Sequence, residues 1–176
     1  MIRVEIESAD VQAAFTRLRQ QLTSMRPLMQ DLGEHLSETT KRRFDTSTAP
    51  DGSRWAPNAE TTYIRYLGRF NSGFGKAGRL NATGVRRAVA KKPLIGETRS
   101  LSTTIHYLAG SDFVEIGSPM VYAAVQQFGA KARSFTGGHS PWGDIPARPF
   151  LGLSGEDRQF IGEAVSGYLE DAFDGP

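Results

Sequence analysis

Residues 73–78 read Gly-Phe-Gly-Lys-Ala-Gly, which matches the G-x-G-x-x-G pattern that brings a backbone close to a dinucleotide pyrophosphate. That chemistry requires a buried strand before the motif and the start of a helix after it. Neither residues 69–72 nor residues 79–81 provide these flanks. The segment does not fit a magnesium-binding phosphate loop either, because Ala77 stands where a Ser or Thr is needed. We therefore interpret the motif as a flexible glycine loop.

The other residues with catalytic or metal-binding potential are scattered. His35, His106 and His139 lie in separate segments, with neither H-E-x-x-H spacing nor a carboxylate cluster beside them. Ser118 is not part of G-x-S-x-G, and the carboxylates at 170–171 lie on the polar side of a predicted helix. The chain has no cysteine, which excludes a thiolate nucleophile, a disulfide and a cysteine zinc site. We predict no catalytic site, no metal and no cofactor.

The length and composition fit one domain, residues 1–176, with 39% hydrophobic and 23% charged residues. The longest purely apolar run, residues 120–125, is far shorter than the ~20 residues that cross a bilayer. The first residues, Met-Ile-Arg-Val-Glu-Ile-Glu, lack the apolar core of a signal peptide. We expect a soluble protein that is made and used in the cytosol and has no membrane partner.

Opposite charges occupy separate parts of the chain, although the overall net charge is only +2. From Lys41 to Arg99, thirteen Lys and Arg stand against four Asp and Glu, a net charge of +9. From Glu156 to Asp174, six acids stand against one Arg, a net charge of −5. This separation favours head-to-tail association of identical copies or docking on an acidic partner. Two solvated surfaces are the alternative interpretation.

The N-terminal part predicts a short strand and two helices. Residues 2–6 alternate apolar and charged side chains, as a half-buried strand does. Ser8 or Asp10 can then cap a helix whose apolar residues follow a helical spacing: Val11, Ala14, Phe15, Leu18 and Leu22. A second helix starts near Pro27 and carries leucines at four-residue steps toward Phe44. We expect these two helices to pack as a pair, joined near residues 23–26.

Residues 46–84 show no regular periodicity. They are rich in Gly, Asn, Ser, Pro and Arg, with aromatic side chains at Trp55, Tyr63, Tyr66, Phe70 and Phe74. So long an irregular connection is usually functional or disordered, so we expect a flexible basic arm that orders on a partner, interrupted by a short helix near 61–67.

The C-terminal half predicts a hairpin and a long helix. Alternation over 101–107 and 114–116, separated by turn residues, indicates two antiparallel strands. A short buried helix should open at Ser118-Pro119 and end at Gly129.

A Gly/Pro loop at 130–144 follows, and residues 145–151 are held extended by two prolines. Ser154 and Asp157 form a near capping box for the last helix. The predicted fold class is α+β, with a small, mainly antiparallel sheet packed by N-terminal and C-terminal helices.

Three segments carry a specific combination of residues. The first runs from Phe44 through Pro-Asp-Gly-Ser-Arg-Trp-Ala-Pro at 50–57. The second runs from Val-Glu-Ile-Gly-Ser at 114–118 to Tyr-Ala-Ala-Val-Gln-Gln-Phe-Gly at 122–129, and the third is Ile-Pro-Ala-Arg-Pro-Phe-Leu-Gly-Leu-Ser at 145–154. In this combination the chain resembles the phage virion morphogenesis, or tail completion, proteins of Mu-like and P2-like phages over nearly its whole length. That family often has His where this chain has Gln at 126 or 127.

The resemblance implies a non-enzymatic virion protein of the neck, assembled in the host cytoplasm, that finishes the tail and joins it to the DNA-filled head. It also implies a ring of identical copies, six to match the tail's symmetry. The expected partners are the chain itself, the tail tube protein, the head-tail connector proteins and phage DNA in the lumen.

The basic segment and the rigid residues near 148 supply the candidate interface. Its members are Trp55, Arg65, Arg69, Lys76, Arg79, Arg86, Arg87 and Arg148. Phe128 and Phe150 are expected in the core, whereas Trp55 and Arg148 fit either core or interface. The alternative function is nucleic-acid binding by the same basic, aromatic arm, since cations neutralise phosphate and aromatic rings stack on bases.

Overall fold

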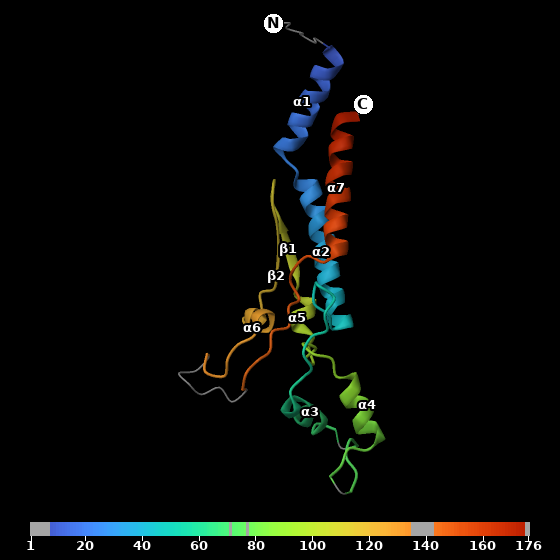
Figure 1. The fold of residues 1–176 in the computed structure, drawn as a ribbon, viewed down its shortest axis with the longest axis vertical. Coiled ribbons are helices and arrows are strands. Elements are labelled where there is room, and N and C mark those ends of the chain that lie inside the picture. Colours follow the sequence, from blue (N-terminus) through green and yellow to red (C-terminus); the bar gives the residue numbers. More distant parts are fainter. Residues whose placement is uncertain (1–7, 71, 77, 135–142, 175–176) are drawn as a thin grey trace. The chain divides into compact units, whose positions relative to one another are not determined.

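The computed structural model describes residues 8–70, 72–76, 78–134 and 143–174. The strand predicted at 2–6, His139 and most of the Gly/Pro loop lie outside these residues. The chain divides into two compact units. Unit 1 comprises Met1–Thr39, His106–Gly117 and Leu153–Pro176, and unit 2 comprises Thr40–Ile105 and Ser118–Gly152. Helix α2 (Arg26–Thr46), which runs from blue to cyan in Figure 1, contributes residues to both.

Unit 1 begins with helix α1 (Ala9–Thr23), which starts where the sequence predicts. Ser8 is the N-cap, and its hydroxyl accepts a hydrogen bond from the Val11 amide at 3.5 Å. Helix α2 then carries the three leucines predicted to face inward, Leu28, Leu32 and Leu36, each 5% exposed. The predicted packing of these two helices on each other is wrong, because α1 packs on α7 instead.

Helix α7 (Gly155–Asp174) has the predicted capping arrangement. Asp157 Oδ2 accepts hydrogen bonds from the Ser154 amide and hydroxyl, both at 2.8 Å, and the Ser154 hydroxyl accepts one from the Asp157 amide at 3.1 Å. The Tyr168 hydroxyl lies 3.2 Å from the Gln21 carbonyl and 3.3 Å from that of Ser24. It thereby binds carbonyls at the C-terminal end of α1, which is a physical reason for α1 to pack here.

The predicted hairpin is present in unit 1. Strands β1 (His106–Ala109) and β2 (Val114–Gly117) pair antiparallel, with Tyr107 opposite Ile116. The predicted strand start at Leu101 is wrong, because residues 100–103 form the short helix α5 (Ser100–Thr103). Leu101 and Ile105 are both 3% exposed, and their four-residue spacing fits a helix as well as a strand.

Unit 2 contains the short helix predicted near 61–67, here α3 (Glu60–Leu67). It packs against α4 (Ala82–Ala90), which the sequence analysis did not anticipate. The Asn81 side chain caps α4 by accepting a hydrogen bond from the Gly84 amide at 2.9 Å. Gly84 is buried, and a Cβ at this position would stand 2.1 Å from the Gly73 carbonyl oxygen. The close approach of the two backbones therefore requires glycine here.

Helix α6 (Ala123–Phe128) begins later than Ser118-Pro119, after a turn. Its predicted burial is wrong: none of its six residues is buried, and Phe128 is 78% exposed, so Phe128 is not core. Hydrogen bonds rather than apolar packing hold the helix, as described below. Gly129 ends it with a φ of 73°, in the predicted cap position. The α+β fold class is confirmed, with one small antiparallel sheet among the described residues.

The tight contact between α2 and the hairpin predicts a large cost for a small substitution. A Cβ at Gly33 would lie 2.2 Å from Tyr107 Cδ2, near the rigid base of the ring. We expect Gly33→Ala to lower the free energy of unfolding by about 1–3 kcal/mol through overpacking. The matched control is Gly167→Ala in α7, which meets open space and should be neutral or stabilising. Urea denaturation of both variants measures the difference, and equal stabilities would contradict the packing.

Candidate assembly surface

An aromatic cluster in unit 2 holds the proline-rich segment at 145–151. Phe44 and Phe150 are almost completely buried, and their ring centroids are 5.4 Å apart. Trp55 meets Phe44 edge-on, at 5.3 Å and 75°. Its indole Nε1 donates a hydrogen bond to the Pro149 carbonyl at 2.7 Å. The expectation that Phe150 is core is confirmed, and Trp55 contributes both apolar area and a hydrogen bond to the same segment.

The backbone that follows Pro149 is bound by side chains rather than by a neighbouring strand. Arg43, in the last turn of α2, donates to the carbonyls of Phe150 at 2.8 Å and Gly152 at 2.9 Å. Gln127 Oε1 accepts from the amides of Phe150 at 2.9 Å and Leu151 at 3.0 Å, and its Nε2 donates to the Leu151 carbonyl at 2.9 Å. One carboxamide therefore satisfies three backbone groups.

Sequence reasoning did not assign a role to Arg43 or Gln127. The sequence clue for Gln127 is that the family which the chain resembles often has His at position 126 or 127. Gln and His side chains can both present an acceptor and a donor. Arg43 gave no such signal, because a cation in the last turn of a helix is ordinary on electrostatic grounds alone.

Arg148 is directed into unit 2 and is 7% exposed. Its Nε donates to the Ala56 carbonyl at 2.8 Å and its Nη2 to the Pro57 carbonyl at 2.7 Å. Burial lowers the pKa of this guanidinium, and Tyr63 acts weakly in the opposite direction. The planar fork matches two carbonyls one residue apart, which an ammonium could not do. Arg148 thus joins the proline-rich segment to the chain that follows Trp55.

A cavity of about 630 Å³ lies beside this junction, within unit 2. Asn58, Lys91, Tyr122, Gln126 and Arg148 are among its lining residues. Burial, followed by the charge of Arg69, lowers the pKa of Lys91, whose ammonium donates to the Ile95 carbonyl. The volume suits a small molecule. The cations in the lining, Lys91 and Arg148, however, donate hydrogen bonds to backbone carbonyls. We therefore interpret this part of the cavity wall as structural.

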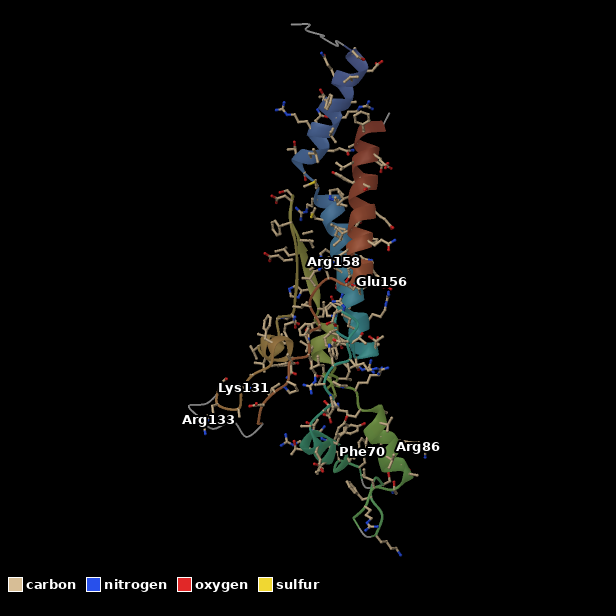
Figure 2. All side chains as sticks on the ribbon, viewed as in Figure 1. Phe70, Arg86, Lys131, Arg133, Glu156 and Arg158 are labelled. Atoms are coloured by element: carbon tan, nitrogen blue, oxygen red, sulfur yellow. The ribbon has the colours of Figure 1, made fainter. Side chains whose placement is uncertain are left out.

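The remaining six predicted interface residues lie on or near α3 and α4. Arg69 forms an ion pair with Glu97, and Arg87 donates to the Ser72 hydroxyl at 3.1 Å while lying 4.2 Å above the Phe70 ring. Arg65, Lys76, Arg79 and Arg86 are exposed. The structure therefore places Arg87 in the packing around Phe70, and Arg86 lies on the outer side of α4 (Figure 2). Trp55 and Arg148 lie together elsewhere in the unit. The interface assignment stays a prediction for all eight.

The acidic residues of α7 form a separate surface, on unit 1. Glu156, Glu163 and Glu170 are seven residues apart and exposed, so they follow one side of the helix. Asp157 is different: its side chain is fully buried, and Oδ1 lies 3.4 Å from His35 Nε2. The His35 ring in turn stacks on Phe160 at 3.7 Å. His35 and Asp157 thus pack the junction of α2 and α7, while the glutamates face solvent.

Neither a metal site nor a membrane-spanning helix is found among the described residues. No group of three or more His, Asp or Glu in that part of the chain is arranged to hold a metal ion. Over the same residues, no helix combines the length and apolar character needed to cross a bilayer.

Comparison with known proteins gave a consistent result. Residues 6–170 match the model of the phage virion morphogenesis family. The chain is also 29% identical, over 145 residues, to tail completion protein S of Escherichia phage P2. That alignment covers 82% of this chain and 84% of the phage P2 protein. No solved structure matches the chain significantly.

The hydrogen bonds of Gln127 predict a measurable dependence of unit 2 on one carboxamide. Gln127→Leu leaves three backbone groups of residues 150 and 151 without their partner, and we expect it to lower the free energy of unfolding by about 2–4 kcal/mol. The matched control is Gln126→Leu, because Gln126 binds the Arg148 amide through its backbone carbonyl at 2.7 Å. Guanidinium denaturation of both variants provides the test. Similar losses in the two would show that the carboxamide does not hold the segment.

Proposed function

Since this chain belongs to the phage virion morphogenesis family and is thus a structural protein of a phage tail, we propose that it completes the tail as a ring of identical copies and joins it to the DNA-filled head. In this role it works by binding rather than by catalysis. It belongs to the neck of the virion and assembles in the host cytoplasm, with the tail tube protein and the head-tail connector proteins as partners.

The observation that carries the proposal is the separation of exposed charge between the two units. Exposed cations, including Arg65, Lys76 and Arg86, belong to unit 2, and the exposed glutamates of α7 belong to unit 1. A cyclic assembly needs two unlike patches on every subunit, so that each copy binds the next in the same orientation. Charge complementarity of this kind steers copies together and excludes wrong orientations.

The second support is the rigidity of the segment at 145–151. Arg43, Gln127 and Trp55 bind its backbone from three directions. A segment that is already ordered pays little conformational entropy when a surface docks on it. These hydrogen bonds therefore hold residues 145–151 in a fixed position, and the exposed surfaces around this segment contact the partners.

The proposed ring predicts a definite mass. We expect the purified protein to form salt-sensitive oligomers, because exposed ion pairs weaken with ionic strength, and to occur on isolated tails in a fixed number of copies. Analytical ultracentrifugation in low and high salt measures the first, and quantitative mass spectrometry of tails measures the second. A single copy on each infectious particle would refute the ring.

Nucleic-acid binding is the second candidate, and the exposed cations near α4 favour it. Tyr66 and Phe70 of the arm do not add to it, because they have intramolecular partners. Tyr66 meets Phe70 edge-on at 5.3 Å, and Lys91 lies 5.1 Å above the Tyr66 ring. Base stacking on these rings would require them to leave those contacts.

The nucleic-acid alternative predicts a salt-dependent affinity for duplex DNA that resides in the exposed cations. Replacing Lys76, Arg79 and Arg86 together by Gln should reduce the slope of log affinity against log salt by about three, one for each lost phosphate contact. Fluorescence anisotropy with a labelled duplex measures the slope. Arg133→Gln, on the loop after α6, is the single-charge control. An unchanged slope in the triple variant would contradict the alternative.

A further inference from the structure

Helix α4 has two chemically distinct sides. One side, which includes Gly84 and Arg87, faces the α3 part of unit 2: Gly84 is buried beside Gly73, and Arg87 lies above Phe70. The other side carries Val85, Arg86 and Val89. Val85 is 48% exposed and Val89 is 82% exposed, although both are apolar. The sequence thus places an apolar pair, i and i+4, with a cation at i+1, on a helix face that is exposed among the described residues.

The last turns of α7 carry the same arrangement with the opposite charge. Leu169 is 40% exposed and Phe173 is 50% exposed, again at i and i+4, and Glu170 stands at i+1. Ala172 and Tyr168 lie on the other side of the helix, where Ala172 is buried and Tyr168 binds the end of α1. Glu163 extends the acidic edge by two turns. Leu169 and Phe173 thus keep part of their apolar surface exposed.

We propose that α4 of one copy docks on the last turns of α7 of the next copy, with Val85 and Val89 against Leu169 and Phe173, and with Arg86 beside Glu170. This inference rests on the proposed function, because it identifies the two elements through which copies in the ring meet. The occupant of the α4 face is a second copy of this chain. The apolar pairs provide the buried area, and the flanking ion pair sets the register.

Charge complementarity and apolar spacing together favour an acidic helix over nucleic acid at this face. A phosphate backbone would satisfy Arg86 but would leave Val85 and Val89 in contact with a polar surface, with no gain from their burial. The contact joins unlike elements, so it is heterologous, and any open assembly keeps one unused α4 face and one unused α7 face, at its two ends, until the ring closes.

The small size of the two faces sets the strength of the contact. A nine-residue helix on three turns of another buries much less than the ~800 Å² per partner of a standard stable interface. A single contact should accordingly be weak, and ring closure or a tail template should supply the remaining stability through effective concentration.

Reciprocal charge reversals test the pairing directly. In Arg86→Glu the two faces of every copy are both acidic, and in Glu170→Arg both are basic. We expect each variant alone to associate at least about tenfold more weakly than the wild type. An equimolar mixture of the two variants restores an acid-base pair at every contact. It should recover the wild-type sedimentation profile, which a folding defect or a contact within one chain would not allow.

An independent pair of variants tests the apolar part. Val89→Asp should weaken self-association at least tenfold, whereas Val121→Asp, at a residue that is 97% exposed beside α6, should not. Circular dichroism confirms that both variants keep the helical content of the wild type. Arg133→Glu serves as the control reversal.

The outcomes separate the two proposals. If the wild type oligomerises and the reversals have no effect, or if mixing the two weakened variants restores nothing, the α4–α7 contact is wrong while the ring stands. If the wild type is monomeric in solution and single-copy on tails, the ring is wrong and this contact falls with it. Restoration by mixing supports both.

Discussion

The structure of unit 2 depends on one constraint: the backbone of residues 148–151 is buried or half-buried without a strand beside it. Pro146 and Pro149 prevent regular pairing, yet the amides and carbonyls of this segment must be satisfied once they leave water. Arg43 and Gln127 meet this need through side chains that come from distant parts of the unit's sequence. Trp55 and Arg148 then connect the same segment to residues 55–57. Removing any one partner leaves a buried polar group behind, so the set acts as a unit.

This use of side chains leaves the proposed contacts with partners to the surface. Two of the residues first assigned to an interface, Trp55 and Arg148, have their polar atoms engaged inside the chain. The cations of α3 and α4 and the glutamates of α7 retain exposure, and they belong to different units. A rigid interior with opposite charge on separate exposed helices is well suited to association of identical subunits.

Exposed apolar residues add a second kind of information to the charge. A scattered apolar residue on a surface is ordinary, but the pairs on α4 and α7 share the same helical spacing. The cation Arg86 stands beside the pair on α4, and the anion Glu170 stands beside the pair on α7. Burial of apolar area contributes affinity but does not fix the relative orientation of the two helices. The neighbouring charges fix that orientation and contribute little affinity. Helices with both features can form contacts that are specific and yet reversible, which an assembling tail requires.

The sequence by itself determined the elements whose signals are local. The Ser8 cap, the leucine steps of α2, the Ser154–Asp157 box and the α+β class all follow from spacing within a few residues, and so does the family resemblance. Tertiary structure alone decided the rest. Phe128 and Phe150 are alike in sequence terms, but only Phe150 meets Phe44, while hydrogen bonds hold the exposed helix that carries Phe128. The packing of α1 on α7 and the hydrogen bonds of Gln127 to residues 150 and 151 likewise join residues far apart in the chain. Tertiary packing also decides which face of α4 stays exposed. No local pattern encodes which distant groups will satisfy each other.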